Sequence, residues 1–165
     1  MVGLPSVLFA DLPGKWALGI SGGGGYLSGA GFGSTAVTFV LPPLPLFWEL
    51  DFRFSSVPYT DLNVDYLIFN NVLSPAVLRG TLRWQIGLGA HTGVGLAPTT
   101  TYFSLAGRLV LGLSWQFKII EIHTFEIFLK LVPSLGFQLT PLSGVYGGIG
   151  IGAGIRFWIN ENKRI

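Results

Sequence analysis

The sequence contains no cysteine and few charged residues. Without cysteine, the chain can form neither a disulfide framework nor a metal site with thiolate ligands. Charged residues make up 11% of the 165 residues, against about 25% in a typical soluble domain, so they are too few to cover a surface exposed to water. The net charge is +2 and the basic residues are scattered, so no basic stripe is present that could bind nucleic acid.

The sequence also lacks any stretch suited to a long helix. It holds 24 glycines and 10 prolines, and both residue types are poor helix formers. Two stretches without charge, 16–48 and 131–155, contain too many of them to form membrane-spanning helices. Aromatic and β-branched residues are plentiful, which excludes a disordered chain. An all-β protein is the class that remains.

The stretch from Phe103 to Phe117 alternates between bulky apolar residues and small or polar ones. Ser104, Arg108 and Gln116 share one face, and phenylalanine, leucine and tryptophan occupy the other. This period predicts a strand of about 15 residues. Ordinary strands have about 5 to 6 residues, whereas a tilted strand needs about 9 to 11 to cross a bilayer. The length of the segment therefore favours a membrane protein.

The same alternation, bounded by glycine, proline, serine and asparagine, predicts strands over 15–22, 34–40, 46–55, 62–70, 81–91, 102–117, 123–138 and 145–159. Eight strands are the smallest number in bacterial outer-membrane barrels, and an even number leaves both termini on the periplasmic side. The sequence thus predicts a closed antiparallel eight-stranded transmembrane β-barrel.

The predicted organisation has three parts: an N-terminal periplasmic segment over 1–14, the barrel over 15–159 and a C-terminal tail over 160–165. Long outward connections are expected at 23–33, 56–61 and 92–101, and a tight inward turn at 41–45. Pro133 has no N–H to donate, so we expect either a bulge there or a strand end that extends beyond the ladder.

The charged residues are expected to face the lumen. Ten of the eighteen lie on the strand parity opposite to the bulky apolar residues, and the other eight lie in connections or tails. A charge that faces lipid at the bilayer midplane of a barrel costs about 2 to 4 kcal/mol, so the apolar parity is expected to face outward. The inward charges are Lys15, Glu49, Asp51, Arg53, Asp65, Arg83, Arg108, Glu126, Lys130 and Arg156.

A soluble barrel with the apolar face inside is the competing interpretation. Gly148, Gly150 and Gly152 share the charged parity, so a soluble barrel would have a surface of bare glycine. A narrow membrane barrel would instead use them to leave space in its lumen. We therefore favour the membrane barrel.

Buried charges need partners, and strand order suggests two clusters among the ten inward charges. Lys15, Glu126 and Arg156 are expected to meet at the lower end, and Asp51, Asp65 and Arg83 are expected to form a second group. We favour a structural ion network that fills the lumen. A gated or ion-conducting pore is the alternative.

The sequence predicts no catalytic, cofactor-binding or metal-binding residues. His91 and His123, the only histidines, are expected at opposite ends of the barrel, so they cannot share a site. His91 falls near Ser55, Ser56 and the loop at 99–101, where a barrel enzyme that modifies lipid could use it. Asp61 would be the only acidic partner nearby. We therefore favour the interpretation of His91 as an ordinary loop histidine over that of a catalytic residue.

A family resemblance is visible in the strands. Residues 125–135 and 147–158 look like the last two strands of an uncharacterised family of small bacterial outer-membrane barrels related to OmpA, OmpX and OmpW. Residues 16–19 resemble its first strand and residues 63–66 a middle one. The resemblance implies an eight-stranded barrel in the outer membrane. Within the final strand, Gly152, Ile155 and Phe157 are similar to the signal read by the outer-membrane assembly machinery, which is the partner implied during biogenesis.

We expect a porin-like outer-membrane protein that is not an enzyme and has no cofactor. It would serve either as a structural barrel or as a binding surface formed by its outer loops. One alternative is transport of a small apolar molecule through the wall, or a narrow gated pore. Another is a role as a membrane subunit of a larger envelope complex. The expected partners are membrane lipid and, in the last case, an envelope protein.

Overall fold

The computed structural model describes residues 12–13, 16–41, 46–77, 80–120, 123–141 and 143–159. Eight antiparallel strands form almost all of this part of the chain. They are β1 (Trp16–Leu27), β2 (Ala30–Leu41), β3 (Leu46–Phe54), β4 (Tyr59–Val77), β5 (Gly80–Ala97), β6 (Thr100–Ile120), β7 (His123–Thr140) and β8 (Gly144–Ile159).

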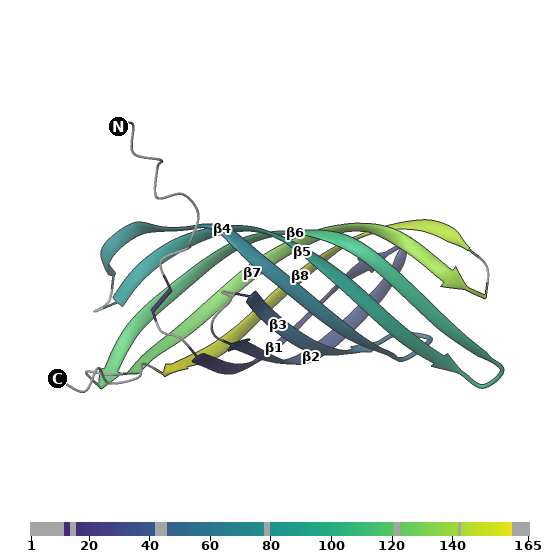
Figure 1. The fold of residues 1–165 in the computed structure, drawn as a ribbon, viewed down its shortest axis with the longest axis horizontal. Helices are drawn as coiled ribbons and strands as arrows, with labels where there is room; N and C mark the ends of the chain where they lie inside the picture. Colours follow the sequence, from purple (N-terminus) through teal and green to yellow (C-terminus); the bar gives the residue numbers. More distant parts are fainter. Residues whose placement is uncertain are drawn as a thin grey trace, which may run out of the picture.

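The strands pair in chain order, and β8 pairs back with β1, so the sheet closes into a barrel (Figure 1). The prediction of an all-β fold with eight antiparallel strands in a closed ring is confirmed. We call the end of the barrel where β1 turns into β2 the upper end, and the end where β1 begins and β8 ends the lower end. Among the described residues, no helix has the length and apolar character needed to cross a membrane.

The connections at the upper end are shorter than the sequence suggested. The long connections predicted at 23–33 and 92–101 are wrong, because β1 and β2 are joined by Ser28 and Gly29, and β5 and β6 by residues 98–99. Ser28 and Gly29 have φ angles of 47° and 85°, the positive values that a tight two-residue hairpin turn needs at both positions. The connection predicted at 56–61 is also shorter, since β4 begins at Tyr59.

The glycines at 22–25 lie inside β1, where its backbone comes close to that of β8. A Cβ atom at Gly23 would lie 2.2 Å from the carbonyl oxygen of Ile151, and one at Gly25 would lie 2.2 Å from that of Ile149. No side chain fits at this distance from a neighbouring backbone. Glycine therefore closes the narrow corner of the barrel, and what the sequence suggested to be a loop is wall.

We expect Gly23→Ala to lower the free energy of unfolding by about 1 to 3 kcal/mol, because the added methyl group overpacks the seam. Gly33→Ala on β2 is the matched control, since a Cβ there has no neighbour closer than 3.9 Å. Urea unfolding in detergent micelles, followed by tryptophan fluorescence, measures both variants. Equal stabilities would contradict the tight corner.

The predicted bulge at Pro133 does not occur. Leu131 pairs with Leu111 and Ser134 pairs with Arg108 in the same register, and the ladder to β6 is only interrupted between them. Pairing of β7 with β8 continues through Pro133 and Ile149. The missing N–H of proline thus opens a gap in one ladder without inserting a residue. Register shifts occur in β4 instead, between residues 67 and 69 and between residues 72 and 74.

The two faces of the wall differ in chemistry. Outward residues are apolar and exposed, for example Leu18 at 60% and Leu135 at 67%. Inward residues include Glu126 and Trp158, both 0% exposed. The structure describes eleven of the eighteen charged residues, and all eleven occupy the inward parity.

Two charged residues lie elsewhere than the sequence suggested. Asp61 and Lys118, predicted in connections, belong to β4 and β6. Asp61 is buried in the lumen, whereas Lys118 is exposed near the lower end. Lys15, predicted to face inward, lies outside the described residues, as do most of the segment 1–14 and the tail 160–165.

Candidate functional site in the barrel lumen

The lower lumen is organised around the fully buried carboxylate of Glu126 on β7. Its Oε2 accepts hydrogen bonds from Arg156 Nη1 at 2.8 Å and Trp158 Nε1 at 2.7 Å. Its Oε1 accepts weaker bonds from Gln116 Nε2 at 3.3 Å and Gln85 Nε2 at 3.4 Å. These donors come from β8, β6 and β5, so one side chain ties three other strands together.

Aromatic rings surround the cation of the same pair. The guanidinium carbon of Arg156 lies 4.4 Å from the ring centre of Phe128 and 4.7 Å from that of Phe47 on β3. Arg156 Nε also donates to Thr38 Oγ1 on β2 at 3.4 Å. Contacts therefore extend across the lumen from β2 and β3 to β5 and β6. We call this set the plug: Phe47, Gln85, Gln116, Glu126, Phe128, Arg156 and Trp158.

A second layer of charge lies above the plug. Lys130 on β7 forms an ion pair with Glu49 on β3, and Glu49 also accepts a bond from Ser21 Oγ at 3.4 Å. Arg108 on β6 places its Nε 3.0 Å from Asp65 Oδ1 on β4, and its Nη2 4.0 Å from Glu49 Oε1. We call these residues the middle layer. The pair of Lys130 and Glu49 crosses the lumen from β7 to β3, whereas Arg108 and Asp65 meet across Gly89 of the intervening strand β5.

The third charged pair lies nearest the upper end. Arg53 donates to Asp61 Oδ2 from Nε at 2.9 Å and from Nη2 at 2.5 Å. Its guanidinium carbon lies 4.8 Å from the ring centre of Tyr59 and 5.3 Å from that of Phe32. Both rings hold the cation in place. The position of Arg53 is thus fixed by a carboxylate and two aromatic faces.

The predicted pairing of charges is only partly found. Glu126 and Arg156 do meet, whereas the cluster of Asp51, Asp65 and Arg83 does not form. Asp65 contacts Arg108, and Arg83 Nη1 donates to the carbonyl oxygen of Asn70 at 2.8 Å. The cause is the stagger of β3 and β4, which sets Asp51 opposite Asp61 and Asp65 opposite Phe47, nearer the lower end.

Sequence reasoning also missed the neutral polar residues of the lumen. The amides of Asn63 and Gln85 and the hydroxyls of Ser104 and Ser114 are buried among the charges. Their inward parity was the available signal, because polar side chains with that parity lie where the charges lie. These neutral groups supply hydrogen-bond donors and acceptors to the charged side chains, whose hydrogen-bonding capacity the ion pairs alone do not satisfy.

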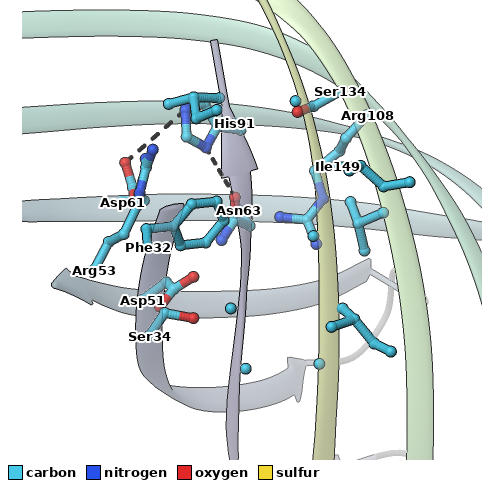
Figure 2. Close-up of a pocket in the computed structure, with 18 of the residues that line it drawn as sticks. Phe32, Ser34, Asp51, Arg53, Asp61, Asn63, His91, Arg108, Ser134 and Ile149 are labelled. Atoms are coloured by element: carbon cyan, nitrogen blue, oxygen red, sulfur yellow. Dashed lines mark hydrogen bonds and ion pairs between the residues drawn. The ribbon is translucent and has the colours of Figure 1, made fainter. Parts of the chain in front are cut away.

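A cavity occupies the lumen above the middle layer (Figure 2). It encloses about 710 Å³ of empty space, including its open side. One wall is almost bare, formed by glycines at 22–24 of β1 and at 148, 150 and 152 of β8. Polar, aromatic and aliphatic side chains form the rest, among them Phe32, Asp51, Arg53, His91, Arg108, Tyr146 and Val132. We call this cavity the upper chamber.

His91 on β5 lies near Asp61, the one acidic neighbour expected from the sequence, but its hydrogen-bond partners are Asn63 and Ser104 in place of the expected Ser55, Ser56 and loop at 99–101. Its Nδ1 lies 3.2 Å from Asn63 Oδ1, its Nε2 lies 3.3 Å from Ser104 Oγ, and Asp61 Oδ1 is 3.9 Å from Nε2. A serine hydroxyl beside one histidine nitrogen and a side-chain amide beside the other is the arrangement of a catalytic nucleophile, its general base and the group that orients the base. Ser104 is 7% exposed, however, and is not among the residues that line the chamber.

The two histidines lie as the sequence predicted, His91 in the upper half of β5 and His123 at the lower start of β7. Within the described residues, no group of three histidine, cysteine, aspartate or glutamate side chains is placed to hold a metal ion.

No protein-family model, curated protein or solved structure matches the chain. The resemblance to the OmpA, OmpX and OmpW barrels stays a prediction from the strand patterns.

Proposed function

We propose that this protein is an integral β-barrel of the bacterial outer membrane and acts as a closed structural barrel without enzymatic activity. The observation that carries the proposal is the division of the two faces. All charged residues in the described part of the chain have inward parity, and large apolar side chains cover the outward face. Water disfavours such a surface, whereas the hydrocarbon of a bilayer favours it.

The ion pairs support a closed barrel over a pore. The plug and the middle layer contact opposite walls at two successive levels. An ion that passes through would have to separate buried pairs, and each separation costs several kcal/mol. An eight-stranded barrel is also just wide enough for its own side chains. These features favour a lumen that supports the wall over one that conducts.

Two of the alternatives lose support. The turns at 28–29 and 98–99 are too short to build a broad binding surface from outer loops. Transport of an apolar molecule through the seam between β1 and β8 needs a break in that ladder, but it runs without a register shift from the pair of Trp16 and Ile159 to the pair of Leu27 and Gly148. The interruption between β6 and β7 beside Pro133 lies one strand away from this seam.

We expect the purified protein, reconstituted into lipid vesicles, to float with the vesicles and to migrate differently on gels before and after heating. In planar bilayers it is expected to show little or no steady current, because the plug blocks the lumen. The matched control is protein that has been heated before its addition to the same lipid and detergent.

Two outcomes contradict the proposal in different ways. Full solubility without detergent would reject the membrane barrel itself. A large steady conductance would leave the membrane barrel in place but reject the closed lumen, and would make a pore the better function.

A further inference from the structure

The upper chamber has the dimensions of a binding site for a small molecule. Its enclosed volume of about 90 Å³ is several times the about 10 to 15 Å³ that one water molecule needs, so a group of a few heavy atoms fits. The middle layer forms its floor, with Glu49, Arg108 and Lys130 among its lining residues. The ion pairs of the middle layer and the plug lie below this floor, so the upper chamber is closed at its lower end.

One carboxylate that lines this chamber has no ion-pair partner. Each of the three bases in the lining already has an acidic partner: Arg53 has Asp61, Lys130 has Glu49, and Arg108 has Asp65, which lies outside the lining. Asp51 is the third acid of the lining and forms no ion pair or hydrogen bond with any residue that the structure describes. The lining thus holds three acids and three bases, but Asp65 holds Arg108 and Asp51 is left without a cation.

The neighbours of Asp51 along the wall cannot neutralise it. On one side β4 sets Asp61, a like charge, directly opposite. On the other side β2 sets Ala36 opposite. Figure 2 shows the oxygen atoms of Asp51 and Ser34 directed toward the open chamber, while Arg53 reaches toward Asp61. The Oδ1 atom of Asp51 is shielded from solvent and has no hydrogen-bond partner.

A carboxylate held in the lumen without a cation is costly, and a ligand that brings a donor and one positive charge to the half-buried Asp51 side chain removes that cost. An ammonium group has three N–H donors and a single charge. The ring of Phe32 and the bare glycines of β1 and β8 leave space for a short apolar chain attached to it. A divalent metal fits less well, because no group of three suitable side chains converges in the described part of the chain.

We propose that the upper chamber binds a small organic ammonium ion, which donates hydrogen bonds to Asp51. This binding role goes beyond the structural role of the barrel. It does not depend on membrane insertion, because the chamber lies inside the wall.

Isothermal titration calorimetry of the folded protein in detergent tests the site, with n-butylammonium chloride as the probe at constant ionic strength. We expect saturable binding to the unmodified protein. Asp51→Asn is expected to weaken it about tenfold or more, since a charge-assisted hydrogen bond is lost. Asp51→Glu keeps the charge and is expected to bind within about threefold of the unmodified protein.

The controls separate this site from simpler causes. Glu126→Gln removes one negative charge from the lower lumen, and neither Glu126 nor its partner Arg156 lines the chamber, so we expect a loss smaller than about threefold. The uncharged analogue n-butanol is expected not to bind. Heat-dependent gel mobility shows that each variant is folded, and Ser34→Ala replaces Asp51→Asn if the latter does not fold.

Four results overturn the proposal. They are absence of saturable binding by the unmodified protein, equal binding by Asp51→Asn, an equal loss in Glu126→Gln, and equal binding of n-butanol. Failure of the protein to insert into vesicles would reject the proposed membrane role and leave this result unaffected.

Discussion

Replacing Glu126 by alanine is expected to lower the free energy of unfolding by about 3 to 5 kcal/mol, the usual cost of removing one partner of a buried ion pair. Arg156 loses the carboxylate 2.8 Å away, and the indole N–H of Trp158 loses its acceptor at 2.7 Å. Both donors are buried, so water cannot replace the lost partner. Equilibrium unfolding in urea, with the protein in detergent micelles, measures the change.

Two variants separate charge from hydrogen bonding. Glu126→Gln keeps an acceptor oxygen without the charge, so its loss of stability is expected to be smaller. The double variant Glu126→Leu with Arg156→Met removes both charges and is expected to recover most of the stability. A loss below about 1 kcal/mol in Glu126→Ala would mean that the pair does not hold the plug together.

The second large effect is expected on the outward face. Leu129 is 47% exposed on β7, between the inward residues Phe128 and Lys130. We expect Leu129→Arg to block insertion into lipid vesicles, because a cation facing lipid near the midplane costs about 2 to 4 kcal/mol. Flotation with the vesicles and protection from protease measure insertion.

The matched control is Leu129→Met, which keeps the side chain apolar and of similar size and is expected to insert normally. Lys130→Met makes the opposite change at the next position, since it removes a charge from the lumen. It is expected to insert while destabilising the middle layer through the unpaired Glu49. Equal insertion by Leu129→Arg and Leu129→Met would reject the proposal that this face contacts lipid.

The sequence was sufficient to predict the strands and which way their side chains point. Both follow from a period of two, which is a local property of the chain. The alternation from Phe103 to Phe117 lies within β6, and the inward parity of Arg108 and Glu126 could be inferred without a structure. Parity alone, however, does not say which inward residues meet.

Contacts within the lumen depend on the stagger between strands, which no local pattern encodes. The register between β3 and β4 brings Asp61 opposite Asp51, and this pairing left Asp65 to contact Arg108. Asp61 itself was missed because the residues before it were predicted to form a loop. The glycines at 22–25 misled in the same way, since glycine is typical both of turns and of a sharply bent wall.

The seam between β1 and β8 also constrains how the molecule can form. Trp16 pairs with Ile159, so the ladder that closes the ring joins segments from opposite ends of the barrel sequence. Such distant pairing raises the contact order and slows folding, because the entropy of closing a very long loop must be lost before any hydrogen bond of that ladder repays it. Until then the outer edges of both strands carry unpaired backbone groups, which are templates for other chains. Closing the ladder between β1 and β8 thus carries the largest loop-closure entropy of the eight pairings, and it also removes the two open edges of the sheet.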